Sequence, residues 1–128
     1  MGRQVLADVC AHAQQDAPCE CCGLLIGNRE AIVEAFPARN DRSGLSRYLI
    51  NPEDHFRAIR KARRAGLAVI GAYHSHPASG PVPSATDLAE ANDTELLHVI
   101  VSLTTRPPSV RGFRYTGREF VPVELRVD

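Results

Sequence analysis

The apolar residues of this chain come in short runs, and this pattern limits its possible folds more than any other feature. The runs at 22–27, 67–73 and 96–103 span six to eight positions and end at glycine or polar residues. Segments of this length are typical of buried β-strands rather than of buried helices. None approaches the roughly 20 apolar residues that a membrane-spanning helix needs. We therefore expect a globular chain built around a β-sheet.

Further strands complete the predicted sheet. Residues 31–36 follow a turn at Asn28-Arg29 and predict a hairpin with 22–27. The polar, glycine-containing segment 39–46 predicts a loop, followed by a short strand over 47–50. Two more strands, 110–115 and 120–125, predict a closing hairpin around Gly117.

Three helices are expected between the strands. Apolar residues at helical spacing place the first over 3–15. Asn51-Pro52 followed by two acids is a strong start for the second, and Gly66 is a plausible stop. Ser84 opens the third helix, which runs to about residue 91. The predicted inward face of the second helix consists of Phe56, Ile59 and Ala62.

These elements predict one α/β domain over residues 1–128, with a mixed β-sheet sandwiched by helices. Basic and acidic residues are equal in number, at 15 each, which argues against a dedicated nucleic-acid binder. The first ten residues lack the apolar core of a signal peptide, so we expect a cytoplasmic protein with no membrane attachment. The four cysteines would then be reduced thiols.

The stretch His74-Ser75-His76-Pro77 carries the clearest chemical signal. Residues i and i+2 at the end of a strand point to the same side, so the two imidazoles can share one metal ion. Asp87 lies on the first turn of the third helix, eleven residues after His76, and the proline-rich loop between them could fold it back as a third ligand. Two histidines and a carboxylate form a known catalytic zinc set with a fourth position for water. We expect one zinc ion per chain.

A hydrolytic zinc site also needs a base and a donor for the oxyanion. Glu20, just ahead of the strand at 22–27, is the best candidate to take a proton from water and pass it to a leaving amine. The hydroxyl of Ser84 would suit the oxyanion of a tetrahedral intermediate. Ser84 and Asp87 also match a helix capping box, which would hold the geometry of the aspartate.

Three motifs taken in order resemble the JAMM (MPN-plus) metallopeptidases: Glu20-Cys-Cys-Gly-Leu-Leu-Ile-Gly27, His74-Ser-His-Pro77 and Ser84-Ala-Thr-Asp87. That family has a glutamate before a glycine-containing apolar strand, then H-x-H-P, then S-x-x-D. The resemblance spans residues 18–104. It implies the JAMM/MPN fold, similar in core topology to the cytidine deaminases, and hydrolysis of a peptide or isopeptide bond. It implies zinc ligands at His74, His76 and Asp87, a general base at Glu20 and an oxyanion donor at Ser84.

The chain resembles the minimal prokaryotic branch of that family, because the loop at 38–47 is short. Eukaryotic relatives that cut ubiquitin chains carry longer insertions near the site. The prokaryotic branch is associated with ubiquitin-like sulfur-carrier proteins, so the resemblance implies hydrolysis after the Gly-Gly tail of such a carrier. The strand edge near Ile50 or the loop at 79–83 could hold that tail by strand addition. A homodimer stays open, because the sequence does not set the oligomeric state.

Other interpretations stay open beside this one. The chain could be a non-catalytic scaffold of the same fold, although inactive relatives usually lose a ligand or the glutamate. It could be a zinc deaminase, although those enzymes carry H-x-E where this chain has His76. Cys19 and Cys22 have C-x-x-C spacing, which could mean a redox pair or a second metal site. Cys22 fits better as a small buried hydrophobe, and the orientation of Cys21 stays open.

The second predicted helix has a basic side. It could be a solvated face that balances acids elsewhere, or a docking face for an acidic protein partner. The basic residues are Arg57, Arg60, Lys61, Arg63 and Arg64. The histidines without partners at ligand spacing are interpreted as surface or core residues: His12, His55 and His98.

Overall fold

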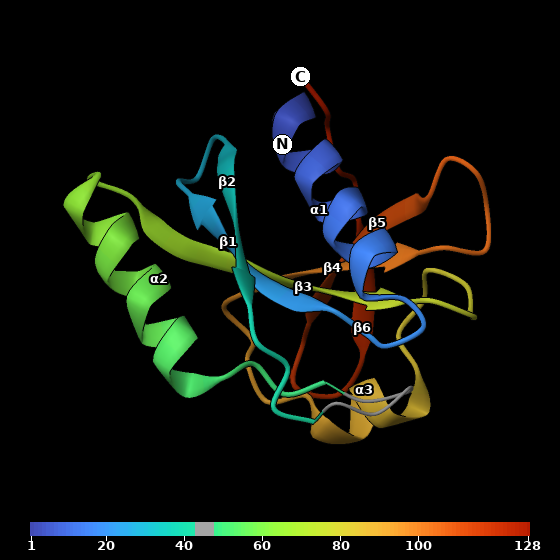
Figure 1. The fold of residues 1–128 in the computed structure, drawn as a ribbon. Coiled ribbons are helices and arrows are strands. Elements are labelled where there is room, and N and C mark those ends of the chain that lie inside the picture. The colour runs from blue at the N-terminus through green and yellow to red at the C-terminus, as the bar shows by residue number, and fades with distance from the viewer. Residues whose placement is uncertain (43–47) are drawn as a thin grey trace.

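The computed structural model describes residues 1–42 and 48–128. Within these residues six strands form one sheet, and three helices pack around it (Figure 1). The helices are α1 (Arg3–Asp16), α2 (Pro52–Arg64) and α3 (Ala85–Glu90). The strands are β1 (Cys22–Gly27), β2 (Ile32–Ala38), β3 (Ala68–His76), β4 (Leu97–Ser102), β5 (Ser109–Tyr115) and β6 (Phe120–Val123). The predicted α/β class is confirmed.

The sheet is mixed and has the strand order β2-β1-β3-β4-β5-β6. β3 and β4 are parallel, and the other neighbouring strands pair antiparallel. The two predicted hairpins are present as β1–β2 and β5–β6. Because β3 and β4 are parallel, the chain must cross back between them, and this crossover contains the proline-rich loop and α3. The crossover starts at the carboxyl end of β3, where the histidine motif lies.

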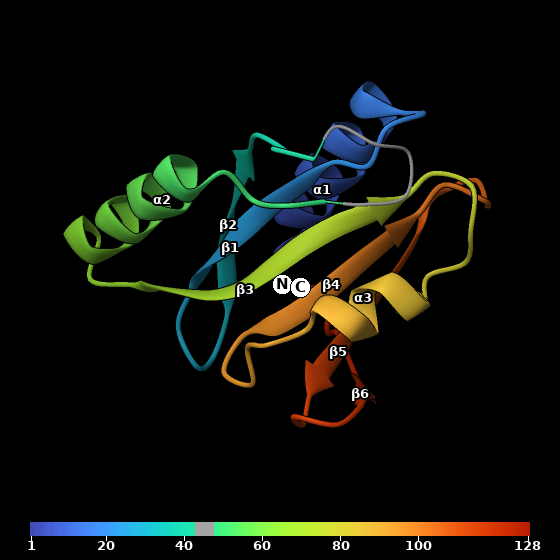
Figure 2. The same cartoon turned by 90° about the horizontal axis from the view of Figure 1, so that it is seen from below.

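α1 and α2 cover opposite faces of the sheet, as the two views of the ribbon show (Figures 1 and 2). Side chains alternate between the two faces along each strand. Leu25 and Tyr73 therefore share a buried cluster with Val9 of α1, whereas Leu24 packs against Ala58 of α2. His74 lies one position beyond Tyr73, which places its side chain on the α2 face.

The ends of α2 follow the prediction, and Ala62 of its predicted inward face is buried, but Phe56 is not. The side chain of Asn51 caps the helix by accepting from the N–H of Asp54, and Gly66 ends it with a positive φ of 72°. The prediction that Phe56 faces inward is wrong, because 60% of it is exposed. Ala58 is buried instead, since a small side chain lets the helix lie close to β1. No helix in the described ranges has the length and apolar character needed to cross a membrane.

Two strand predictions need correction. β3 continues to His76 rather than ending at Tyr73, because its parallel pairing with β4 extends as far as Ser102. The strand predicted over 47–50 is not formed by the described part of that segment, where Ile50 makes one isolated bridge to Asn40. Backbone hydrogen bonds from Asp41 N to Leu49 O at 2.8 Å and from Asn51 N to Arg39 O at 2.9 Å form this bridge. Asn40 Oδ1 also accepts from the N–H of Leu49 at 2.9 Å. Residues 43–47 of the predicted loop and strand lie outside the described residues.

Candidate metal centre

Two imidazoles meet at the carboxyl end of β3. His74 and His76 lie on one face of the sheet, with their Nε2 atoms 3.1 Å apart. Both residues are buried, with 4% of each exposed. His74 is held on both sides, because its backbone pairs with Cys22 of β1 and Ile100 of β4. The spacing of two residues therefore directs both rings to one point.

Asp87 reaches the same point from α3. The Oγ atom of Ser84 accepts from the N–H of Asp87, and the Asp87 carboxylate accepts from the N–H of Ser84, both at 2.9 Å. This reciprocal pair is the predicted capping box. It places Asp87 Oδ2 3.1 Å from Nε2 of His74 and 3.0 Å from Nε2 of His76. The Ser84 hydroxyl accepts in this arrangement, so its own hydrogen can be donated to a further group.

The three converging atoms suit a cation. The carbonyl oxygen of Gly80 lies 2.9 Å from Nδ1 of His76, so Nδ1 carries the ring proton. In the neutral ring, Nε2 of His76 then has a lone pair that faces His74 Nε2 and the Asp87 carboxylate. Such lone pairs repel one another unless a proton or metal ion lies among them. Ligand atoms around a tetrahedral zinc are ~3.3 Å apart, close to the 3.0–3.1 Å spacing here.

The pKa shifts of the residues at this centre also favour a bound cation. Burial lowers the pKa of His74, which keeps the ring neutral, as a metal ligand must be. Burial also opposes charge on His76, but hydrogen bonds to Asp87 and Gly80 outweigh it and raise the pKa of this ring. Burial works against an ionised Asp87 too, yet its bonds to both histidines hold the pKa of the carboxyl far below its ordinary range. The surroundings therefore stabilise a positive charge between the rings.

Glu20 joins the group from the segment just before β1. Two hydrogen bonds tie the backbone of Cys21 to Ser75, one from Cys21 N to Oγ at 2.8 Å and one from Ser75 N to Cys21 O at 3.1 Å. They place Glu20 so that its ligand atom and those of His74 and His76 all lie within 4.8 Å of one another. Glu20 is 6% exposed, and its Oε1 has no hydrogen-bond partner within the described residues. Burial raises the pKa of this carboxyl to about 7.

Three contacts that support the centre were not predicted from the sequence. The ring of Tyr48 stacks on His74, with centroids 4.2 Å apart and planes 17° from parallel. Asn40 Nδ2 donates to the Glu20 carbonyl at 3.1 Å. Ser102 Oγ donates to Ser79 O at 2.6 Å, which holds the proline-rich loop. Such partners lie 20 or more residues apart in the chain, where periodicity carries no signal.

The cysteines are free thiols in this structure, including the C-x-x-C pair. Cys22 is fully buried, which agrees with its interpretation as a small hydrophobe, and burial raises the pKa of its thiol to about 12. Cys21 faces away from the metal centre, because it packs in the cluster beneath α1. Among the other histidines, His12 has core partners: Nδ1 lies 2.7 Å from the Tyr73 hydroxyl.

A cavity of about 260 Å³ opens beside the centre, between α2 and α3. His74 and Asp87 form part of its wall, and its size suits one or two side chains rather than a folded domain. Apolar side chains form one part of the lining and titratable groups another. The apolar residues include Ile50, Leu96, Ile100 and Phe120, and the titratable ones include His55, Glu90, Asp93 and His98.

The fold defines the class of JAMM-type hydrolases, together with the two buried histidines of β3, the carboxylates of Glu20 and Asp87 beside them, and Ser84 at the start of α3. Comparison with known sequences narrows this class. The chain belongs to the family of prokaryotic homologs of the JAB domain, whose pattern matches residues 2–116. The predicted resemblance is thereby confirmed, and with the buried Glu20, His74 and His76 group it indicates a metal ion.

Several relatives are named as enzymes. A desampylase from Haloferax volcanii is 32% identical over 127 residues, which cover 94% of this chain and 89% of the relative. A probable TtuB-protein conjugate cleaving protease from Thermus thermophilus is 37% identical over 90 residues, 70% of this chain and 60% of its own length. A CysO-cysteine peptidase from Mycobacterium tuberculosis is 31% identical over 109 residues, 81% of this chain and 73% of its own.

Solved structures agree on the fold. The solution structure of a protein from Desulfitobacterium hafniense superposes with a TM-score of 0.91 at 28% identity and covers all of this chain and 93% of its own. The crystal structure of a JAB1/MPN domain protein from Archaeoglobus fulgidus superposes with a TM-score of 0.67 at 24% identity, covering 98% of this chain and 95% of its own. The second match supports the fold alone.

Proposed function

We propose that this protein hydrolyses the peptide or isopeptide bond that follows the Gly-Gly tail of a ubiquitin-like sulfur-carrier protein. The observation that supports the reaction most directly is the convergence of His74, His76 and Asp87 at about 3 Å. Beside them lies the buried Glu20 carboxyl, whose Oε1 has no hydrogen-bond partner among the described residues. The substrate class is inferred from the relatives, which are named for desampylation, TtuB-conjugate cleavage and CysO-cysteine cleavage. The free cysteines fit a cytoplasmic site of action.

We assign one zinc ion to His74, His76 and Asp87. Two ring nitrogens and one carboxylate oxygen are a donor set that zinc favours in hydrolases, and a fourth position stays open for water. A bound zinc would make that water acidic enough to act as a nucleophile near neutral pH, and it would polarise the substrate carbonyl. His76 is oriented for this role by the Gly80 carbonyl, since a hydrogen bond to the other ring nitrogen selects the tautomer.

The remaining steps belong to the protein's own side chains. Glu20 accepts a proton from the attacking water and later gives it to the leaving amine, so the water oxygen ends on the new carboxylate of the tail. A carboxyl whose pKa burial has raised is suited to holding the proton between these two steps. The hydroxyl of Ser84 donates its hydrogen to the oxyanion that forms when the carbonyl is attacked.

Two features of the protein near the metal centre are candidate binding sites for the substrate tail. The cavity beside His74 and Asp87 has room for a side chain next to the scissile bond. The isolated bridge between Asn40 and Ile50 leaves a short backbone ribbon near the centre, where an extended tail could add as a strand. Both features lie on the α2 face of the sheet, with the metal centre. A homodimer stays a prediction that the oligomeric state in solution would test.

The first experiment measures metal content together with cleavage. Protein purified without a histidine tag is expected to hold about one zinc per chain and to release the terminal residue from a carrier ending in Gly-Gly-Cys. A chelator should stop the release, and added zinc should restore it. Asp87→Ala is expected to lose zinc, whereas Asp93→Asn, a matched change at another carboxylate of the same cavity, should keep it.

The alternative is a non-catalytic scaffold of the same fold. It predicts carrier binding without cleavage and no dependence on zinc. Failure to bind zinc even after reconstitution would rule out the hydrolase and favour the scaffold. Release of ammonia from nucleosides, without cleavage of the carrier, would instead indicate a deaminase.

A further inference from the structure

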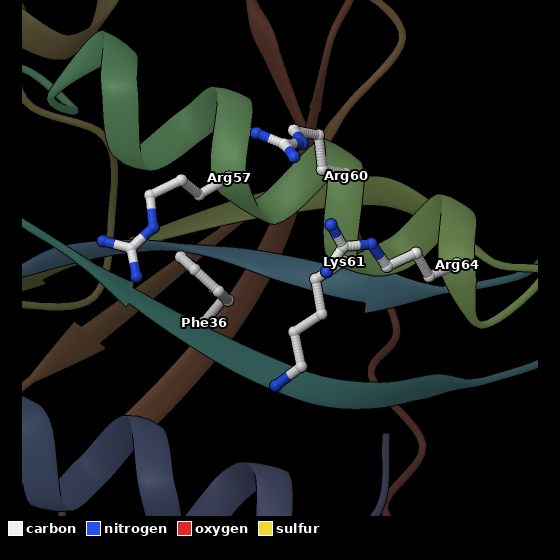
Figure 3. A pocket seen from close by; sticks show the side chains of 5 residues that line it. All are labelled: Phe36, Arg57, Arg60, Lys61 and Arg64. Atoms are coloured by element: carbon white, nitrogen blue, oxygen red, sulfur yellow. The ribbon is translucent and has the colours of Figure 1, made fainter.

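The outer side of α2 presents a basic face next to an aromatic ring. Four cationic side chains of the helix and Phe36 of β2 line an open cavity of about 410 Å³. Phe36 rises from the strand between the side chains of Arg57 and Lys61 (Figure 3). The basic face is defined by Arg57, Arg60, Lys61 and Arg64, together with Phe36.

Much of the charge on this basic face is not neutralised. Lys61 pairs with Glu34, and Arg57 lies 3.9 Å from Asp54 at the start of the helix. Within residues 1–42 and 48–128, Arg60 and Arg64 form no ion pair. Two adjacent exposed guanidinium groups repel one another, and an acidic partner relieves that repulsion.

The ring of Phe36 gives the basic face an apolar floor. Leu24 of β1 is the register partner of Phe36, and Phe36 packs on the cluster around Leu24 and Ala58. The nitrogen of Lys61 lies 5.9 Å from the centre of the Phe36 ring, so the ring is bordered by charge. An aromatic floor with a charged rim is the composition of a protein–protein contact, with an apolar centre and polar edges.

The basic face lies within reach of the metal centre. Phe36 is two residues before Ala38, Ala38 pairs with Cys22, and Cys22 pairs with His74. Two strand spacings amount to about 10 Å, and two residues along a strand add about 7 Å, so the backbones of Phe36 and His74 are ~12 Å apart. Because an extended chain covers 3.3–3.6 Å per residue, about four residues bridge this distance.

We propose that the basic face docks the folded body of the carrier protein through an acidic surface patch, while the carrier's extended tail reaches the metal centre. This inference rests on the proposed function and adds the part of the enzyme that recognises the substrate outside its tail. The carrier patch is expected to place an apolar side chain on Phe36 and carboxylates against Arg60 and Arg64. Charge attraction of this kind speeds encounter and sets orientation.

A protein partner is favoured over a nucleic acid. The chain has equal numbers of basic and acidic residues, whereas nucleic-acid-binding domains usually carry a clear basic excess. The cations of the basic face lie on a single helix of 13 residues, about 20 Å long, which is short for a groove that follows a phosphate backbone.

The test compares two substrates that share one tail. One is the folded carrier ending in Gly-Gly-Cys, and the other is a peptide of its last six residues with the same end. The variant is Arg60→Glu with Arg64→Glu. The control is Arg63→Glu, which reverses one charge on the same helix, at a residue that lines a different cavity with Ile59 and Leu67. Arg60→Glu alone is measured beside it, so that single charge reversals are also compared.

In the double variant, the ratio of kcat/KM for the carrier to kcat/KM for the peptide should fall about tenfold or more, mainly through KM. Raising the salt concentration should lower the same ratio for the native protein. The Arg63→Glu ratio should stay at the native value. An unchanged ratio in the double variant, or an equal fall in the control, would overturn the docking proposal.

Failure of the proposed function gives a different result. If native protein cleaves neither substrate, carrier binding is measured by titration calorimetry. Loss of binding in the double variant alone would uphold the docking face without catalysis, and equal binding by all three proteins would overturn it. Tighter binding to a DNA oligonucleotide than to the carrier, lost in the same variant, would assign the face to nucleic acid and overturn the proposal.

Discussion

At the scale of single residues, the orientation of His76 decides what the centre can bind. Its Nδ1–H is donated to Gly80, so Nε2 is left to face Asp87 and His74. A second carboxylate, that of Glu20, lies beside the rings without a hydrogen-bond partner in the described part of the chain. Asp87 is held by its hydrogen bonds, so we assign it to binding the metal ion. Glu20 is not held in this way, so we assign it to proton transfer.

Replacing Glu20 by Gln tests this division. The change keeps the shape of the side chain but removes its ability to accept and return a proton. We expect zinc content to stay near one per chain while kcat falls by about 10²–10⁴. Metal analysis and steady-state kinetics on the same preparation check both parts, with Glu30→Gln on the exposed β1–β2 turn as the control. Full turnover by Glu20→Gln would show that another group carries the proton.

Tyr48 is expected to position a metal ligand rather than to react. Its ring stacks on His74 at 4.2 Å, and this limits rotation of the imidazole. Tyr48→Ala should weaken zinc affinity by about 10–100-fold, the range for contacts that orient ligands. Tyr48→Phe keeps the ring and should stay close to native affinity. Competition with a chromophoric chelator measures both, and equal weakening by Phe and Ala would show that the hydroxyl matters instead.

At the scale of elements, close contacts between neighbouring elements determine how the strands and helices are held together. A Cβ atom at Gly23 would lie 2.4 Å from the ring of Tyr73, so the glycine lets β1 and β3 pair while the aromatic ring stays buried. The start of α2 is tied to the end of β2 in a similar way. Asp54 accepts from the backbone N–H of Arg39 at 2.8 Å and from its Nε at 2.9 Å.

The link between Asp54 and Arg39 should make stability depend on pH. Hydrogen bonds from the Arg39 side chain and backbone lower the pKa of Asp54. A carboxyl whose pKa is lowered in the folded state stabilises the fold above its unfolded pKa of about 4, and this stability is lost as the pH falls through the folded value. The native protein should therefore lose stability towards acid pH.

Asp54→Asn should remove this contribution. We expect it to reduce the free energy of unfolding by about 1–2 kcal/mol at pH 7 and to flatten the acid limb of the stability profile. Urea unfolding from pH 7 to pH 3 measures both effects. Asp8→Asn, at an exposed carboxylate bonded to Gln4 within α1, is the control and should keep the native profile. An unchanged acid limb in Asp54→Asn would contradict the assignment.

At the scale of the whole molecule, the sheet separates the larger buried cluster on its α1 face from the metal centre and the basic face on its α2 face. The α1 face holds the larger buried cluster, with Val9, Tyr73 and Val99 at its centre. The α2 face holds a smaller cluster around Leu24, together with the metal centre and the basic face. Side chains on the α2 face can therefore be used for binding and chemistry, while the α1 cluster supplies much of the apolar burial.

Metal removal should lower the stability of the whole fold. The proposed ligands come from β3 and α3, so a bound ion ties the crossover to the sheet. A ligand that binds only the folded state stabilises it by about 2.7 kcal/mol at a concentration 100 times its Kd. Zinc should raise the Tm of native protein and of Glu20→Gln, but not that of Asp87→Ala. A similar rise in Asp87→Ala would place the ion elsewhere.

The sequence by itself determined most of the local structure and part of the centre. Asn51 and Gly66 mark the ends of α2, and the box formed by Ser84 and Asp87 places the carboxylate at the start of α3. These features can be predicted because each depends on residues a few positions apart, where backbone hydrogen bonds and side-chain alternation set the outcome. The order of the motifs was enough to indicate the family.

Only the tertiary structure decided which distant residues meet. β3 reaches His76 because β4 pairs beside it, and Glu20 lies at the histidines because Cys21 and Ser75 share two hydrogen bonds. The stacking of Tyr48 on His74 has the same origin. Phe56 satisfies the helical period yet lies outside, since close packing of the helix on the sheet selects alanine. Contacts of this kind depend on register, burial and the distance between elements, which local periodicity does not contain.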